Sequence, residues 1–140
     1  NLPTKDLFVS RQHRVLVRSE IAERMFGQKE LLVAAHKLLA LDGFDVDESA
    51  TKVEYFHILF DRHQIVFSNG APTESLFTGP EALKSVSQEA REEIVEIFPE
   101  VLCMDFTPRP ARTIPRQGRR ILRLAERHKK NKKPILQMIA

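Results

Sequence analysis

A β-rich block that ends at a tight turn limits the folds that this chain can adopt. The segment "VEYFHILFDRHQIVFSNG", residues 53–70, is rich in valine, isoleucine, tyrosine and phenylalanine, which favour strands. Asn69-Gly70 is a turn signal because both residues tolerate a positive φ. We expect a hairpin over Val53–Phe67 whose reversal is at Asp61-Arg62.

Further strand and turn patterns precede this block. Apolar residues alternate well enough over Leu7–Val17 to predict a strand. The segment "SEIAERMF" fits a helical turn that Gly27 stops. The segment "ELLVAAHKLLALDG", residues 30–43, fits the helical period, but a buried strand followed by a turn explains such a short apolar run equally well.

Beyond Ser75 the pattern becomes helical. Apolar residues at helical spacing predict a helix over Pro80–Phe98, which Pro99 ends. A linker rich in proline and arginine, Thr107–Pro115, precedes a second expected helix over Arg116–Lys130. Its apolar stripe is formed by Ile121, Leu122 and Ala125. The division expected is residues 1–79 as a β-rich part, residues 80–106 as a helical extension and residues 107–140 as a basic linker and helical tail.

Composition narrows the class of protein. A chain of 140 residues with 42% hydrophobic residues suits one globular domain. The single cysteine, Cys103, excludes an internal disulfide framework. No apolar run is long enough to cross a bilayer and no signal peptide is visible, so we expect no membrane association, and the compartment stays unknown. The residues given begin at Asn1 and not at Met, so we expect an upstream portion.

The histidines are the candidate functional residues. His13, His57 and His63 lie in otherwise apolar segments, with Asp61 near two of them. Buried polar side chains are costly unless they are hydrogen-bonded or used. Each could be an ordinary satisfied strand residue. Together the four could bind a metal, although no close pair of ligands with metal-site spacing is present. Histidine could also transfer a proton near neutral pH.

Three motifs resemble Hint domains, the fold shared by hedgehog autoprocessing domains and inteins. "VSRQHRVLV" carries a hydroxyl residue, two variable residues and a histidine, here Ser10 to His13. "ELLVAA" resembles a strand of a bacterial Hint group, and "VEYFHILFDRHQIVFSNGAPTES" resembles the carboxyl-terminal motif. The resemblance covers about Asp6–Phe77. It implies a mainly β fold, the carboxyl-terminal part of a Hint domain, followed by an α-helical extension. It also implies that residues 30–35 form a strand and not a helix.

The resemblance implies self-cleavage of an upstream peptide bond without a cofactor. In similar domains a leading cysteine or serine attacks the preceding carbonyl. The histidine matching His13 helps to protonate the leaving nitrogen, and the hydroxyl matching Ser10 orients the amide or the histidine. Asp61 or His63 is the candidate for activating the nucleophile. Similar domains often occur in large secreted bacterial proteins.

The chain departs from the family pattern in two places. No leading nucleophile is present, and Cys103 lies beyond the Hint-like region. We therefore expect the chain to be inactive alone and to need the missing amino-terminal half of the domain as a partner, in cis or in trans. Inteins finish with His-Asn, and the matching place here is Glu74-Ser75. Serine cannot cyclise to a succinimide, so splicing is not expected.

The charge distribution leaves a second function open. Residues 107–134 hold eleven Lys or Arg and one acid, Glu126, whereas the other residues hold eleven basic and eighteen acidic residues. Such a tail is either a solvated helix that packs on the acidic body or an arm that binds nucleic acid. The tail lacks interleaved aromatic residues, zinc ligands and a helix-turn-helix pattern. The alternative to self-cleavage is therefore a non-catalytic interaction module that binds nucleic acid through this tail.

Overall fold

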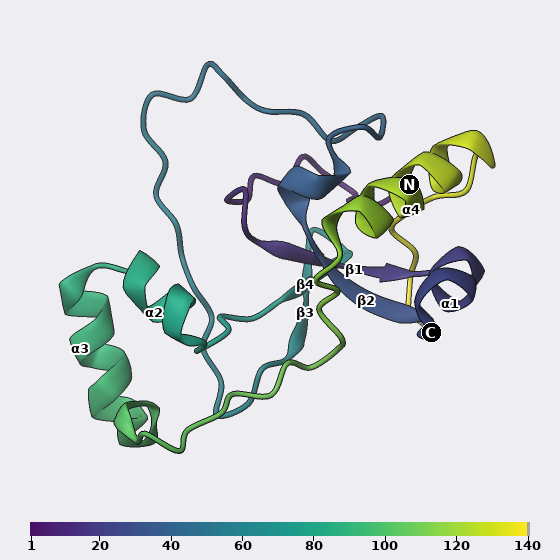
Figure 1. Cartoon of the computed structure of the whole chain (residues 1–140). Coiled ribbons are helices and arrows are strands. Elements are labelled where there is room, and N and C mark those ends of the chain that lie inside the picture. Colours follow the sequence, from purple (N-terminus) through teal and green to yellow (C-terminus); the bar gives the residue numbers. More distant parts are fainter. Residues whose placement is uncertain (140) are drawn as a thin grey trace.

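In the computed structural model, residues 1–139 are described, with the side chain at position 81 left out. Four strands form one antiparallel sheet in the order β2-β1-β4-β3 (Figure 1). Strands make up 14% of the chain, and helices, 3-10 turns included, make up 31%. The expectation of a mainly β fold with a helical extension is confirmed only in part: a β-sheet and helices are present, but helices outweigh strands. The bounds are β1 Arg14–Arg18, α1 Glu20–Phe26, β2 Glu30–Ala34, η1 Ala35–Leu38, β3 Ile65–Ser68, β4 Ala71–Glu74, α2 Pro80–Ser85, α3 Gln88–Ile97, η2 Pro99–Leu102 and α4 Gly118–Lys130.

Capping residues at both ends of α1 specify the unit β1-α1-β2. Ser19 caps α1, because its hydroxyl oxygen accepts the N–H of Ala22. Gly27 ends the helix with φ +70, a left-handed conformation that glycine adopts without a steric penalty. The short helix returns the chain antiparallel to β1, so that Val15 pairs with Val33. The strand over "ELLVA" followed by η1 confirms the strand-plus-turn interpretation of this segment and not the helical one.

The hairpin of the sheet is centred on Asn69-Gly70. Asn69 has φ +48 and Gly70 has φ +80, as the turn signal predicts. The turn joins β3 to β4, and the N–H of Thr4 donates to the carbonyl of Asn69 at 2.8 Å. The amino-terminal residues therefore brace the turn.

The expected hairpin over Val53–Phe67 is wrong. Residues 53–60 form no strand, and the wide connection between η1 and β3 swings away from the sheet (Figure 1). Among the described residues β3 has β4 as its only strand neighbour, and residues 53–60 do not pair along its outer edge. The main chain of this segment bonds instead to the residues that follow β4. Where β4 has ended, the N–H of Leu76 reaches the carbonyl of Ile58 at 2.8 Å. Phe56 in this connection is 86% exposed.

The core lies between one face of the sheet, α1 and α4. It is a single cluster of buried apolar side chains: Val15, Val17, Ala22, Met25, Leu31, Val33, Leu38, Leu41, Ala71, Ile121, Leu124, Ala125, Ile135 and Leu136. Helix α4 forms as expected and buries Ile121 and Ala125 in this cluster. Leu122 is 48% exposed, so its assignment to the apolar stripe is wrong. Leu124 and the polar His128 take its place, which fixes the rotation of the helix.

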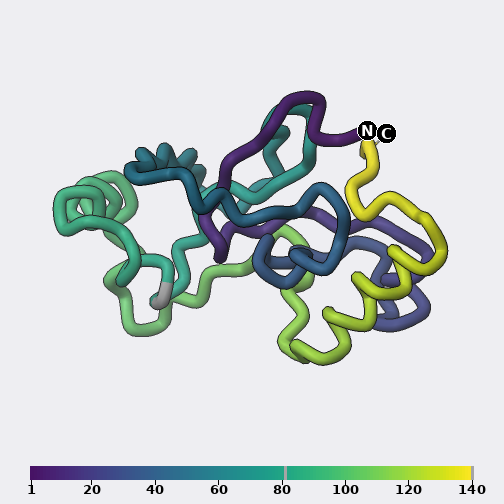
Figure 2. The backbone as a smooth tube through the Cα atoms, turned by 90° about the horizontal axis from the view of Figure 1, so that it is seen from above, coloured from purple at the N-terminus to yellow at the C-terminus, as the bar shows by residue number. Residues whose placement is uncertain are grey.

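The helix expected over Pro80–Phe98 is broken in two. Val86 is extended, and Ser87 starts α3 as its cap by accepting the N–H of Ala90 at 3.2 Å. Helices α2 and α3 lie to one side of the sheet in both views (Figures 1 and 2). None of the described residues between 80 and 106 belongs to the core cluster. Of the helices that the structure describes, none is long and apolar enough to cross a bilayer.

Candidate active site

His13 is positioned by a turn and not by a strand. Its N–H donates to the carbonyl of Ser10 at 3.1 Å, and β1 begins only at Arg14. The expected strand over Leu7–Val17 is therefore too long at its amino-terminal end. The turn places Ser10 and His13 at its two ends, and the carbonyl of His13 accepts the N–H of Ala35 at 2.9 Å. The main chain of His13 is thus held in place directly before the start of β1.

A partly buried ion pair lies next to His13. The main-chain N–H of Arg14 donates to Glu74 Oε1 at 2.8 Å, and the guanidinium Nη1 of Arg14 donates to Glu74 Oε2 at 3.1 Å. The Glu74 side chain is 7% exposed and that of Arg14 is 27% exposed. Burial raises the pKa of Glu74, but the hydrogen bond from His63 and the charge of Arg14 outweigh it and the pKa is lowered. Glu74 is therefore a carboxylate at neutral pH.

His63 joins this ion pair to the carboxyl-terminal linker. Its Nδ1 accepts the main-chain N–H of Ala111 at 2.9 Å, so the ring proton is on Nε2. Nε2 donates to Glu74 Oε2 at 3.0 Å. The His63 side chain is 2% exposed, and its ring centroid lies 4.9 Å from that of Phe77. Both nitrogens of His63 are therefore occupied.

The imidazole of His13 has a nitrogen without a partner. Its Nε2 is buried and has no hydrogen bond within the described residues. Burial lowers the pKa of His13, the carboxylate of Glu74 opposes this, and the charges of His57 and Arg14 lower it further. At neutral pH the ring is therefore neutral. A neutral imidazole with a free nitrogen can accept a proton and later return it.

His13, Arg14 and Glu74 line one cleft of about 520 Å³. Its wall includes Ser10, His13, Glu74, Ser75 and Phe56. Ser75 is 3% exposed, and its hydroxyl oxygen accepts the N–H of Gln64 at 2.9 Å. The cleft is large enough for a few residues of an extended peptide.

The structure thus brings together some of the predicted site residues and not others. Ser10, His13, Glu74 and Ser75 line the cleft, and His63 contacts it through Glu74. Asp61 is exposed and is absent from the cleft wall. The metal alternative from His13, His57, His63 and Asp61 finds no counterpart, because no three His, Cys, Asp or Glu side chains gather as a possible metal site among residues 1–139.

Two partners in the site were missed at the level of sequence. Arg14 supplies both a main-chain and a side-chain donor to Glu74, and the N–H of Ala111 fixes the tautomer of His63. The available signal for Arg14 was an arginine beside the candidate histidine and an acid in the terminal motif. Ala111 had no signal, because any residue except proline offers the same N–H.

Comparison with known proteins gives one match. A search of curated proteins and a search of solved structures each found no match. A family model described as "Hint domain" matches residues 1–80, which contain His13, His63 and the whole Glu74 ion pair. The match covers more than half of the chain and includes all four strands of the sheet. The chain therefore belongs to the Hint domain family.

Proposed function

We propose that the chain is the carboxyl-terminal part of a self-cleaving Hint domain and that His13 is its proton-transfer residue. The observation that carries this proposal is the buried, unpartnered Nε2 of His13, a residue that lines a peptide-sized cleft. A buried polar nitrogen without a partner costs about 1–3 kcal/mol. An outside group that binds this nitrogen, such as the nucleophile or the scissile amide, removes that cost.

The proposed reaction is an acyl shift at a peptide bond in a segment upstream of these residues. A thiol or hydroxyl of that segment attacks the preceding carbonyl, and His13 Nε2 takes its proton. The carbon–nitrogen bond then breaks, and His13 returns the same proton to the leaving nitrogen, which yields a thioester or ester and a free amine. The lowered pKa of His13 suits both steps, because a neutral ring accepts the proton and the imidazolium readily gives it up. Such catalysis is typically worth about 10²–10⁴ in rate.

The remaining polar residues receive supporting roles. Ser10 is proposed to orient the amide or the His13 ring across the turn that joins them. His63 is proposed as a positioning residue and not as the base, since both of its nitrogens are engaged. Asp61 stays the weaker candidate for activating the nucleophile because it lies outside the cleft wall.

Release of a downstream segment by splicing is not part of the proposal. Glu74 and Ser75 stand where inteins carry His-Asn. A serine side chain has no amide nitrogen and cannot close a succinimide. The Ser75 hydroxyl is also bonded to the N–H of Gln64.

The test is a fusion with a reporter, in which the upstream segment of the natural gene is placed before Asn1. Cleavage is read on a gel with and without dithiothreitol, which intercepts a thioester. We expect thiol-dependent release of the reporter, a smaller rate for Ser10→Ala and nearly unchanged cleavage for Ser75→Ala. We expect no cleavage when the reporter is fused directly to Asn1. Release of the reporter from that direct fusion contradicts the assignment of the nucleophile.

A further inference from the structure

The exposed face of α4 carries a row of cations. Arg119, Arg123, Arg127 and Lys130, here called the basic stripe, are all exposed and follow one another at spacings of four, four and three residues. Residues at these spacings share one face of a helix. Successive arginines of the stripe are therefore about 6 Å apart along the helix axis, since the rise is about 1.5 Å per residue. Glu126 is the single acid on this helix.

The opposite face of α4 is locked into the core. Leu124 and Ala125 are fully buried there. His128 is also fully buried, its Nε2 lies 2.9 Å from Ser19 Oγ, and its Nδ1 lies 3.2 Å from the carbonyl of Lys133. The helix therefore cannot rotate, and the basic stripe is presented to solvent in a fixed orientation.

The charges of the basic stripe are not neutralised by the acidic body. The ion pairs found for the carboxyl-terminal third join Arg112 to Glu30 and Lys129 to Asp42, and within residues 1–139 none involves the basic stripe. An electrostatic contact between the tail and the body thus does not explain the stripe. Neighbouring like charges on a helix destabilise it by roughly 0.2–0.5 kcal/mol per pair.

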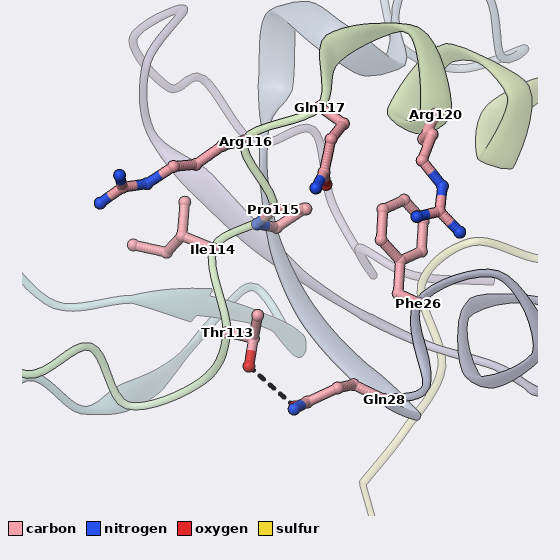
Figure 3. Close-up of a pocket in the computed structure, with 8 residues that line it drawn as sticks. All are labelled: Phe26, Gln28, Thr113, Ile114, Pro115, Arg116, Gln117 and Arg120. Atoms are coloured by element: carbon pink, nitrogen blue, oxygen red, sulfur yellow. Dashed lines mark hydrogen bonds between the residues drawn. The ribbon is translucent and has the colours of Figure 1, made fainter.

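The start of α4 adds a second unfavourable arrangement. Its first turn contains Arg119 and Arg120 and no acid, although the helix dipole favours anions at this end. Arg120 turns inward, over the ring of Phe26 at 5.0 Å and onto the carbonyl of Met25 (Figure 3). The guanidinium of Arg116 extends away from Phe26 and Arg120 in the same view, and Arg119 is exposed. Residues that break a local stability rule without compensation mark functional surfaces.

We propose that the basic stripe binds the phosphodiester backbone of a nucleic acid. Arginine forks suit phosphate oxygens, and regular cations on a rigid helix suit a regularly charged polyanion. Binding to an anionic membrane fits less well, because a membrane-bound helix inserts its apolar face and that of α4 is already buried in the core. This inference is independent of the proposed cleavage reaction and goes beyond it.

The test compares two variants of equal net charge. Arg119, Arg123 and Arg127 are replaced by glutamine in one variant, and the exposed Lys5, Lys52 and Arg62 in the other. Each set lowers the net charge from +3 to zero. Glutamine is a good helix former, so α4 should persist, and circular dichroism checks this.

Binding is measured by fluorescence anisotropy with a labelled DNA duplex and a labelled single-stranded RNA, over a series of salt concentrations. We expect a Kd for the natural chain of about 10⁻⁶–10⁻⁴ M, as is usual for non-specific contacts. The stripe variant should bind at least tenfold more weakly, and its slope of log Kd against log salt should fall by about 2 to 3. The two probes distinguish a duplex from a single strand as the source of the phosphates.

Three results overturn the proposal. The first is an equal loss of affinity in both variants, which assigns the effect to net charge alone. The second is the absence of saturable binding to either nucleic acid in the expected range. The third is equal or tighter binding to polyglutamate or to vesicles containing anionic lipid, which assigns the stripe to an acidic protein or to a membrane.

Discussion

Replacing Glu74 with glutamine should destabilise the fold through a specific hydrogen-bond conflict. The carboxylate accepts from the Arg14 main chain at 2.8 Å, the Arg14 guanidinium at 3.1 Å and His63 Nε2 at 3.0 Å. A glutamine amide has one oxygen and one NH₂ group. Either orientation points the NH₂ group at a buried donor. His63 cannot relieve the conflict by changing tautomer, because its Nδ1 would then present a proton to the N–H of Ala111.

The expected loss follows from the burial of the pair. Removing one partner of a fully buried ion pair costs about 3–5 kcal/mol, and one unsatisfied buried donor costs about 1–3 kcal/mol. Since the Arg14 side chain is 27% exposed, water partly solvates its charge. We therefore expect Glu74→Gln to lower the free energy of unfolding by about 2 to 3 kcal/mol at neutral pH. Glu96→Gln on the exposed side of α3 is the control and should change it by less than about 0.5 kcal/mol.

Urea denaturation followed by circular dichroism measures both variants. The pH dependence of the free energy of unfolding is a second test, because the direction of its change follows from the pKa of Glu74. The folded pKa of Glu74 lies below its ordinary value of 4.5, so its contribution is present above that pH and is lost as the pH falls through the folded pKa. The difference between Glu74→Gln and the natural chain should shrink at acid pH. A variant within about 0.5 kcal/mol of the natural chain at neutral pH would refute the description of the Glu74 network.

Three further predictions concern the fold. Burial lowers the pKa of His128 from 6.5, so the free energy of unfolding falls as the pH drops below that value and the buried ring must take up a proton. In a series of unfolding curves at different pH, His128→Asn should make this decrease in the free energy of unfolding smaller. Gly70→Ala should cost about 1–2 kcal/mol in urea denaturation, because φ is +80 there and the added methyl would meet side-chain atoms of Leu2 and Thr4 at 3.3 Å. Leu124→Ala, which empties a fully buried position, should cost about 3 kcal/mol in the same experiment, and the half-exposed Leu122→Ala less than about 1 kcal/mol; equal losses would contradict the orientation of α4.

The parts of the fold that could be predicted from sequence are those with local turn and capping signals. The helix between Ser19 and Gly27 and the turn at Asn69-Gly70 are specified by residues that act on their own backbone. The strand at Glu30–Ala34 was not specified in this way, because its apolar period suits a helix. Family resemblance resolved it, since the pairing partner of this strand lies outside the segment.

Non-local geometry explains the misassigned segments. Val53–Phe60 has the composition of a strand, but whether it pairs with β3 depends on the path of the distant chain around it, and Ile58 bonds instead to Leu76 beyond β4. Leu122 was placed in the buried stripe because hydrophobic pattern alone gives no weight to a histidine. The rotation of α4 is set instead by His128 and its contact with Ser19, 109 positions away in the chain.

In the candidate site, too, local contacts could be predicted from sequence and long-range contacts could not. Ser10 and His13 are joined by one turn, so their proximity could be predicted from spacing. The contact between Arg14 and Glu74 spans sixty positions and arises because β1 lies beside β4. Its existence therefore became evident only from the sheet order.

A comparison of two histidine variants tests whether His13 transfers the proton in self-cleavage. His57 lines the same cleft but is exposed, which makes His57→Ala a matched control for His13→Ala. In the fusion that carries the natural upstream segment, we expect His13→Ala to slow cleavage by about 10²–10⁴, as loss of a positioned acid–base group does. His57→Ala should stay within about tenfold of the natural rate. Cleavage at the natural rate by His13→Ala would contradict proton transfer by His13.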